Sequence, residues 1–343
     1  MKKVKVLLIV NIIQIVLLIG SIVAMIFVLP NVMLFSNTKI PSVVVMGTTE
    51  DVHNGYVQVT TYGAIPNDNK DDTNAFKKAL QTNASIYIPD GVYDIDETVV
   101  IEDKNIKGSG SGRTIIRSAA SDYAISAKGN CVIEELGIEF SNLSGNEKTG
   151  EKVAIFDNGL TNGSMVKSVA FKNIGTGFLS SADKNGAFCT TIEAVTFDDY
   201  SYKAIDIKSG LSTVLRSVTI GKGKTDKLIP VTLGGVVTVE SVTFNDTVCE
   251  YAIELNNSLS AILRSVIFNK TNATSSNFVL CDSARFAMHT VTLIESTGEN
   301  LICVADEKGS TTKSGGSVLM IYSNGKDINV SNDKTITCDA ILK

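Results

Sequence analysis

The chain has 343 residues, a formal net charge of -5 at pH 7 and no tryptophan. An acidic protein lacks the basic surface that binds the phosphates of nucleic acids, so this composition excludes a nucleic-acid partner. A chain of this length ordinarily forms two domains. Only the first 56 residues differ in character from the rest, however. We therefore expect a membrane anchor at residues 1–35, a tether at residues 36–56 and one folded domain at residues 57–343.

The amino terminus has the pattern of a single-pass membrane anchor. Residues 6–29 carry no charge and follow Lys2, Lys3 and Lys5. As a helix they would be about 36 Å long, enough to cross a bilayer core of about 30 Å. Lysines before the span place the amino terminus inside and the body outside the cytoplasm. A cleaved signal peptide is the alternative, and it exports the body as well.

The segment after the tether predicts a capping helix followed by two strands. Asp71 and Asp72 precede residues 73–80, whose apolar side chains share one helical face, and an aspartate suits the start of a helix. Residues 85–93 read Ser-Ile-Tyr-Ile-Pro-Asp-Gly-Val-Tyr, which predicts a strand, a turn and a second strand. The helix is therefore expected to cover one end of the domain.

These motifs resemble the entry segment of the pectate lyase-like superfamily. The matching stretches are residues 62–64 (Tyr-Gly-Ala), 71–80, 88–93 (Ile-Pro-Asp-Gly-Val-Tyr) and 106–108 (Ile-Lys-Gly). The most similar members are grouped with rhamnogalacturonases, epimerases and phage tailspikes. The resemblance implies an all-β, right-handed parallel β-helix that acts on or binds polysaccharide, usually an acidic one. It does not imply activity, because one fold hosts many functions. Tailspike members are trimers, but no feature of this chain marks a subunit interface.

From residue 131 the chain repeats one short phrase seven times. The phrase is an apolar residue, a charge, a small residue and then Val-x-Phe or a close variant, as in residues 239–244. After a first step of 33 residues, its copies lie 23 to 26 residues apart, a period typical of a stacked solenoid. The alternation within Val-Thr-Phe predicts a strand. Two further apolar runs per repeat predict three short strands per coil.

The charged position of the phrase alternates in sign from copy to copy. It is occupied by Glu134, Lys167, Glu193, Arg216, Glu240, Arg264 and finally His289. In a parallel stack these side chains would lie about 4.8 Å apart, each between opposite charges. We interpret them as a surface ladder that sets the register, and exclude them from the search for a catalytic site.

A carboxylate pair is the best candidate for catalysis. Neither histidine is placed as a proton shuttle, since His53 falls in the tether and His289 in the charge ladder. If Val231 aligns with Ile205 and Ile253, then Asp206, Thr232 and Glu254 share one outward column. Two rungs would separate the carboxylates by about 9.6 Å, at the edge of the range of about 6.5–9.5 Å for inverting glycosidases.

Asp206 and Glu254 are the predicted acid and base. Lys208 is the predicted base if the protein is a lyase, and the resemblance then implies Ca²⁺ as cofactor; otherwise neither cofactor nor metal is expected. Tyrosines beside carboxylates suit sugar binding, so the following residues of the flanking turns are predicted to bind substrate: Asp198, Asp199, Tyr200, Tyr202, Glu250 and Tyr251.

The predicted function is therefore an exported, membrane-anchored β-helix that binds an extracellular polysaccharide, with cleavage by lyase or hydrolase chemistry left open. The outward positions expected in neighbouring coils, Ser126, Phe156, Leu179 and Val279, are not acidic. A surface or phage-associated β-helix without catalysis, used for attachment or structural display, is the alternative.

Six cysteines permit disulfides in an exported chain, but most of them lie in or beside apolar strand runs, where cysteine behaves as a small core residue. We therefore expect buried thiols at Cys131, Cys189, Cys249, Cys281, Cys303 and Cys338.

Overall fold

The computed structural model describes residues 55–304 except 149, 181–189, 276, 284–285 and 299, together with strands at residues 315–320, 322–323 and 337–342. The expected membrane span at residues 6–29 lies outside the described residues, as does most of the expected tether. Within the described ranges, no helix combines the length and apolar character needed to cross a membrane.

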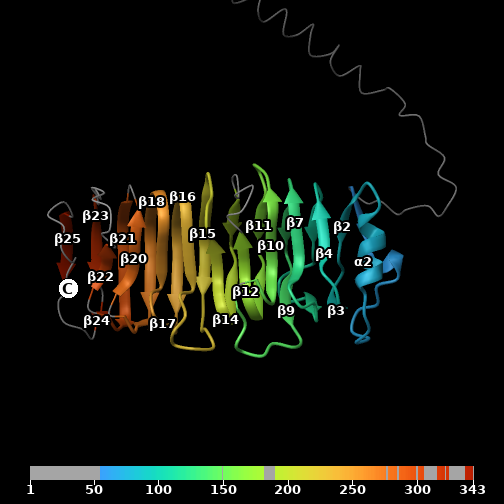
Figure 1. The fold of residues 1–343 in the computed structure, drawn as a ribbon, viewed down its shortest axis with the longest axis horizontal. Helices are drawn as coiled ribbons and strands as arrows, with labels where there is room; N and C mark the ends of the chain where they lie inside the picture. Colours follow the sequence, from blue (N-terminus) through green and yellow to red (C-terminus); the bar gives the residue numbers. More distant parts are fainter. Residues whose placement is uncertain are drawn as a thin grey trace, which may run out of the picture. The chain divides into compact units, whose positions relative to one another are not determined.

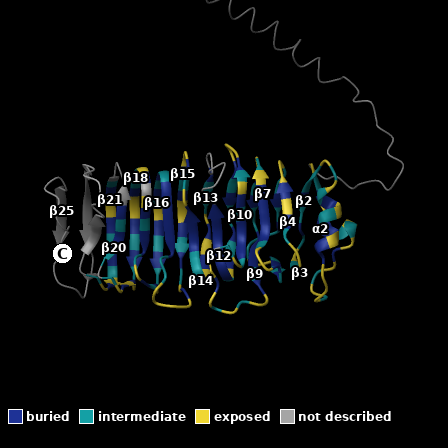
Figure 2. Ribbon diagram, in the orientation of Figure 1, coloured by how far each residue is buried: buried dark blue, intermediate teal, exposed yellow. Residues whose placement is uncertain are grey.

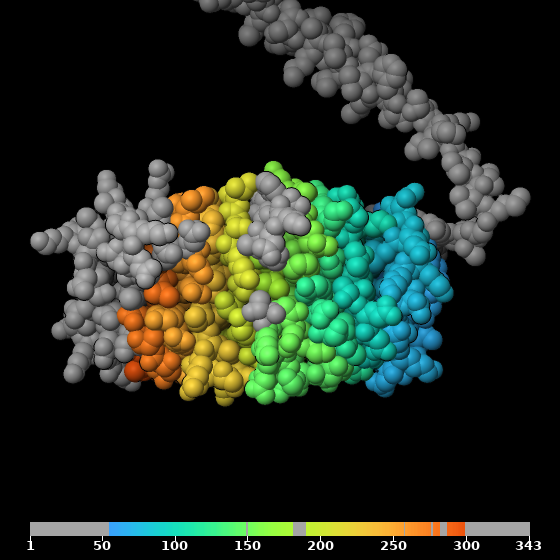
Figure 3. All heavy atoms as spheres, viewed as in Figure 1, coloured from blue at the N-terminus to red at the C-terminus, as the bar shows by residue number. Residues whose placement is uncertain are grey.

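The domain is a parallel β-solenoid, as the repeat predicts. Each strand pairs in parallel with its counterparts in the neighbouring coils, and the coils follow one another in sequence order along the stack (Figures 1 and 3). The strands are β1 (Tyr56–Gln58), β2 (Ser85–Tyr87), β3 (Gly91–Ile95), β4 (Val99–Glu102), β5 (Ile106–Lys107), β6 (Thr114–Ser118), β7 (Tyr123–Gly129), β8 (Val132–Glu134), β9 (Gly137–Phe140), β10 (Val153–Leu160), β11 (Met165–Lys167), β12 (Ala170–Ser180), β13 (Thr191–Glu193), β14 (Thr196–Ile207), β15 (Thr213–Ile220), β16 (Val231–Asn245), β17 (Val248–Cys249), β18 (Ile253–Asn269), β19 (Asn272–Ala273), β20 (Asn277–Ser283), β21 (Phe286–Ser296), β22 (Asn300–Val304), β23 (Gly315–Met320), β24 (Tyr322–Ser323) and β25 (Thr337–Leu342).

The predicted charge ladder is confirmed by the register of the strands. Glu134 pairs with Lys167, and the pairing continues coil by coil through Arg216 to His289. Arg216 illustrates the contacts, because its guanidinium lies 3.6 Å from the Glu193 carboxylate and 3.2 Å from that of Glu240.

The residue after each charge, which is small in six of the seven copies, is where the chain bends. All seven of these residues have left-handed backbone conformations, with φ between 52° and 58°: Glu135, Ser168, Ala194, Ser217, Ser241, Ser265 and Thr290. A side chain in this conformation is strained by its Cβ atom, so bulky β-branched residues are disfavoured there. Strand pairing continues through several of these bends. Long bent strands such as β16 and β18 therefore replace the three separate short strands that the sequence predicts.

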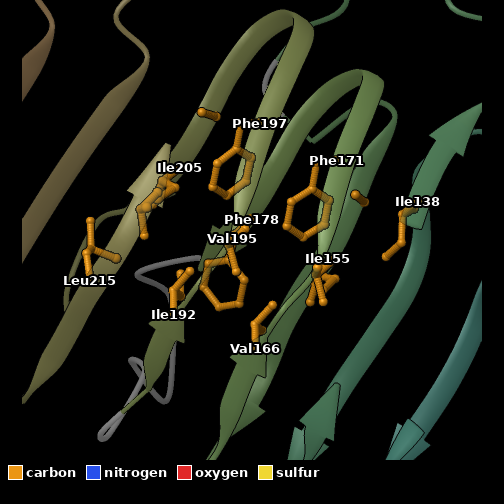
Figure 4. Packing of buried hydrophobic residues seen from close by; sticks show 14 of the residues in the cluster. Ile138, Ile155, Val166, Phe171, Phe178, Ile192, Val195, Phe197, Ile205 and Leu215 are labelled. Atoms are coloured by element: carbon orange, nitrogen blue, oxygen red, sulfur yellow. The ribbon is translucent and has the colours of Figure 1, made fainter. Parts of the chain in front are cut away.

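The interior of the solenoid is filled by aligned apolar side chains. Buried residues follow the strands, while exposed residues gather in the connecting loops (Figure 2). Phe171 and Phe197 come from adjacent coils and stack with ring centroids 4.7 Å apart (Figure 4). Cys131 and Cys249 are buried free thiols, as expected.

Cys281 is buried as well. The side chains of Cys189, Cys303 and Cys338 lie outside the described part of the chain.

The predicted capping helix is α2 (Thr73–Leu80), which lies at one end of the stack (Figure 1). It buries Phe76 against Tyr93, with ring centroids 6.2 Å apart and an edge-to-face angle of 77°. A short 3-10 helix, η2 (Val59–Tyr62), precedes it. At the start of α2, Asp71 Oδ1 accepts a hydrogen bond from the Thr73 amide at 2.9 Å. Asp72 instead accepts one from the Ile65 amide at 2.9 Å.

The buried carboxyl group of Asp72 should make the stability of the folded domain depend on pH. Its burial, together with the charges of Asp68, Asp94 and Asp71, raises its pKa from 3.8 to about 6. The folded state therefore binds this proton more tightly than the unfolded state, and stability falls as the pH rises from about 4 to about 6. Asp72→Asn keeps the acceptor for Ile65 and removes the charge. We expect a gain of about 1 kcal/mol in unfolding free energy at pH 8 and none at pH 4.

Urea unfolding at the two pH values measures this difference, with Asp96→Asn as the control because Asp96 is exposed in a neighbouring turn. A gain of equal size at both pH values would show that the Asp72 charge is not the cause.

Candidate functional site

The candidate site lies on an outward column of side chains along strands β4, β7, β10, β12, β14, β16, β18 and β20. Register pairing places Val231 opposite both Ile205 and Ile253, as predicted. The column, here named the Asp206 column, runs Val100, Ser126, Phe156, Leu179, Asp206, Thr232, Glu254 and Leu280. The prediction of Val279 as the neighbour of Glu254 is wrong by one residue, because Val279 pairs with Ile253 and points into the core.

Lys203 joins the polar members of the column into one cluster. Its ammonium donates a hydrogen bond of 2.6 Å to Thr232 Oγ1, which in turn donates one of 2.9 Å to Glu254 Oε2. The same nitrogen lies 3.7 Å from Asp206 Oδ1 and 4.0 Å from Glu254 Oε2. Side chains from three successive coils therefore meet around a single cation.

The two carboxylates are closer together than their register alone suggests. One nitrogen contacts both groups, so Asp206 Oδ1 and Glu254 Oε2 are at most about 8 Å apart, below the upper limit of about 9.5 Å for inverting glycosidases. Side-chain bending accounts for the difference from the predicted separation of about 9.6 Å along the axis.

Asp206 is a nearly buried carboxyl group. Its side chain is 3% exposed, compared with 21% for Glu254. Its Oδ1 has the Lys203 ammonium at salt-bridge distance but no partner at hydrogen-bond distance among the described residues. Burial raises the pKa of Asp206, the charge of Glu254 adds to the rise, and the ammonium groups of Lys203 and Lys208 oppose it. A raised pKa is the property that a general acid requires.

Lys203 is the functional candidate that sequence reasoning missed. It precedes Asp206 by three residues, and strict alternation would place the two side chains on opposite faces of the strand. The register of β12 and β14 shifts between Ile174 and Thr176, at the bend just before Lys203, so the alternation is broken there. The sequence did contain a signal for this residue, because Lys203 is a lysine only three positions from the predicted catalytic Asp206.

A loop holds β14 in place just before Lys203. Ser201 donates a hydrogen bond to the carboxylate of Glu147, which also accepts hydrogen bonds from Ser144 and from the Gly145 amide. Burial raises the pKa of Glu147, but the hydrogen bonds from Ser201 and Ser144 outweigh it and lower the pKa to about 2. This satisfied buried carboxylate fixes the backbone from which Lys203 projects.

Two predictions about β14 need correction. Asp198 to Tyr202 were expected in a turn, but they lie within the strand. Tyr200 was predicted to bind sugar, yet its side chain is fully buried and its hydroxyl donates to the Gly221 carbonyl at 3.3 Å. It follows a left-handed bend at Asp199, which turns the Tyr200 ring into the core.

The other predicted site residues are at least partly accessible. Tyr202 lies beside the cluster, with the Lys203 ammonium 5.7 Å from its ring centroid. Asp198, Lys208 and Glu250 are exposed, and Tyr251 is half-buried in the segment between β17 and β18. Across the described ranges, no three side chains of His, Cys, Asp or Glu gather to form a metal site.

Comparisons with known proteins agree with this architecture. Residues 56–275 match the family described as rhamnogalacturonase A/epimerase, pectate lyase-like. ORF18 of Geobacillus virus E2 is similar in structure, with a TM-score of 0.53 and 13% identity over 78% of this chain and 62% of that one. The Agl-KA catalytic domain has a TM-score of 0.50 and 14% identity over 78% and 58% of the two chains.

Full-length tailspike protein 2 from Escherichia coli O157:H7 bacteriophage CAB120 has a TM-score of 0.50 and 12% identity over 84% of this chain and 46% of that one. At such identities the likeness is one of fold alone. The chain matches 46–62% of the length of these three structures. A comparison with curated proteins finds no match.

Proposed function

Because the chain belongs to the rhamnogalacturonase A/epimerase, pectate lyase-like family, we propose that it binds a polysaccharide over the Asp206 column. The observation that carries this proposal is the cluster of Lys203, Asp206, Thr232 and Glu254. It combines an ammonium, a hydroxyl and two carboxylates on an outward face of the solenoid. Sugar hydroxyl groups both donate and accept hydrogen bonds, so a partly open cluster of this kind suits them.

Hydrolysis is the second candidate function. The raised pKa of Asp206 favours it, together with a second carboxylate, Glu254, no more than about 8 Å away. Asp206 would then protonate the leaving oxygen, and Glu254 would activate a water molecule. The Asp206 side chain is 3% exposed, so the cluster has to open before the acid can reach a glycosidic oxygen.

Other parts of the proposal rest on the sequence and the resemblance. They are export of the domain, its attachment through a membrane helix at residues 6–29, and the right-handed sense of the coils, which parallel crossovers almost always adopt. Attachment or structural display without catalysis remains the alternative use of the same binding surface.

Binding of the full-length protein to a panel of neutral and uronic-acid polysaccharides tests the proposal. Thr232→Val and Glu254→Gln are expected to weaken binding about 10-fold or more, because the first removes a hydroxyl group from the cluster and the second removes a negative charge. Thr243→Ala, on a different face of the solenoid, is the matched control. The proposal fails if no polysaccharide binds, or if the control weakens binding as much as the cluster variants.

The same mixtures, with and without Ca²⁺, distinguish the reactions. New reducing ends without unsaturated products, abolished by Asp206→Asn, would support hydrolysis. Unsaturated products would instead indicate a lyase and direct attention to Lys208 as the base.

A further inference from the structure

We infer that the polysaccharide over the Asp206 column is neutral rather than a polyuronate. This inference rests on the proposed function and narrows it to a substrate class. The family resemblance alone would favour an acidic polymer, so the inference depends on the charges and apolar surfaces of this chain. Three observations support it, beginning with the polar cluster.

The cluster has no surplus of positive charge, because the one ammonium of Lys203 faces two carboxylates. Lys203 contacts both carboxylates and donates a hydrogen bond to Thr232. Lys208 is exposed, and no ion pair within 4.0 Å joins it to a described carboxylate, although it is close enough to Asp206 to lower the pKa of that group. A bound uronate would need a cation of its own, because a carboxylate held near Asp206 and Glu254 without one is repelled.

The column beyond Asp206 is mainly apolar. Leu179, 4% exposed, is its neighbour in the preceding coil, Phe156 follows one coil further on, and the buried Ser126 lies between Phe156 and Val100. The ring of Phe156 stacks on Tyr123 with centroids 4.2 Å apart, and both rings are half-buried. Val100, two coils from Phe156 along the column, is 59% exposed. Apolar ring surfaces suit the C–H faces of neutral sugars, whereas a carboxylate pressed against them would lose hydration without gaining a partner.

The described cations beside this apolar stretch are already engaged. Lys128 lies 2.6 Å from the Glu102 carboxylate. Lys152 donates a hydrogen bond of 2.8 Å to the Ala120 carbonyl, and its ammonium lies 5.7 Å from the centroid of the Phe140 ring. A polyuronate carries a charge on every sugar, and a chain along the stack would place several carboxylates beside these engaged lysines, so the exposed Lys208 could pair with only one of them.

The net charge of the whole chain also disfavours an acidic polymer, although more weakly. The charge of -5 repels polyanions at long range, and salt screens that repulsion. Raising the ionic strength is therefore expected to improve the binding of a uronate polymer and to leave the binding of a neutral polymer unchanged.

Matched pairs of polymers test the inference with the full-length protein. Polygalacturonate and polymannuronate are each compared with their own carboxyl-reduced form, which keeps the linkages and removes the charges, and neutral glucans complete the set. We expect the reduced form to bind at least about 10-fold more tightly than its parent. Tighter binding of a uronate parent would overturn the inference but leave the proposed function standing. Failure of every polymer to bind would overturn both.

A substitution in the Asp206 column tests whether the preference for a neutral polymer depends on the apolar side chains of this column. Phe156→Ala is expected to weaken binding of the preferred neutral polymer about 10-fold, while Thr243→Ala on the other face leaves it unchanged. An unchanged affinity of Phe156→Ala would contradict the apolar part of the binding surface and overturn the inference.

Discussion

Replacing Lys203 by methionine is expected to lower the free energy of unfolding by about 3 kcal/mol at pH 8, because the change leaves buried charges without their partner. The side chain of Lys203 is 13% exposed, and its ammonium contacts both Asp206 and Glu254. The variant also removes the hydrogen bond to Thr232. Methionine has a similar length and fills the same space, so the loss reports on charge rather than on packing.

The loss of stability should depend on pH. The pKa of Asp206 is already raised above 3.8, and the Lys203→Met change raises it further. A raised carboxyl pKa means that the folded state binds the proton more tightly than the unfolded state. The destabilisation is therefore fully present above the folded-state pKa of Asp206 and diminishes as the pH falls toward 3.8.

Urea unfolding at pH 4.5 and pH 8 measures this effect. The double variant Lys203→Met/Asp206→Asn should recover much of the loss at pH 8, since it removes the unpaired charge. Lys172→Met, a change of an exposed lysine in β12, is the control and should alter stability by no more than about 0.5 kcal/mol. A loss of the same size at both pH values would contradict the assigned role of Lys203.

Phe197→Ala is expected to lower the free energy of unfolding by about 3–5 kcal/mol, because it opens a cavity between two coils. The ring is 1% exposed and stacks on Phe171 at 4.7 Å with an interplanar angle of 10° (Figure 4). It also packs directly on Gly177, where an added Cβ atom would lie only 2.3 Å from it. The backbone at Gly177 is therefore matched to this ring and cannot readily collapse into the space that the ring leaves.

The neighbouring residue provides the control for this prediction. Thr196 is exposed on the outer side of the same strand, so Thr196→Ala should change the unfolding free energy by no more than about 0.5 kcal/mol. Phe197→Leu should give an intermediate loss. Equal losses for Thr196→Ala and Phe197→Ala in chemical denaturation would contradict the stacked core.

Much of the fold could be predicted from the sequence because it depends on short-range patterns. The apolar positions of the repeated phrase indicate which side chains face inward. Because the coils are of similar length and stack on one another, equivalent positions of successive repeats become neighbours. For this reason the charge ladder and the alignment of Ile205, Val231 and Ile253 are confirmed by the register. The same reasoning was wrong at Val279. Phe278 and Val279 are both buried, and a slip of one residue exchanges the inner and outer faces.

The candidate site was only partly predictable. Asp206 and Glu254 were found because both occupy regular strand positions, but Lys203 was missed and Tyr200 was assigned wrongly. Both residues follow the left-handed bend at Asp199, and Lys203 also follows the register shift between β12 and β14.

By itself, the sequence determined that this chain stacks parallel strands into a solenoid with an outward column of alternating surface charges, because side-chain periodicity and repeat length suffice for both. Only the tertiary structure decided that Lys203 joins Asp206, Thr232 and Glu254, and that Tyr200 belongs to the core. At a bend the two-residue alternation is lost, so the direction of each side chain depends on backbone torsions and on contacts with other coils.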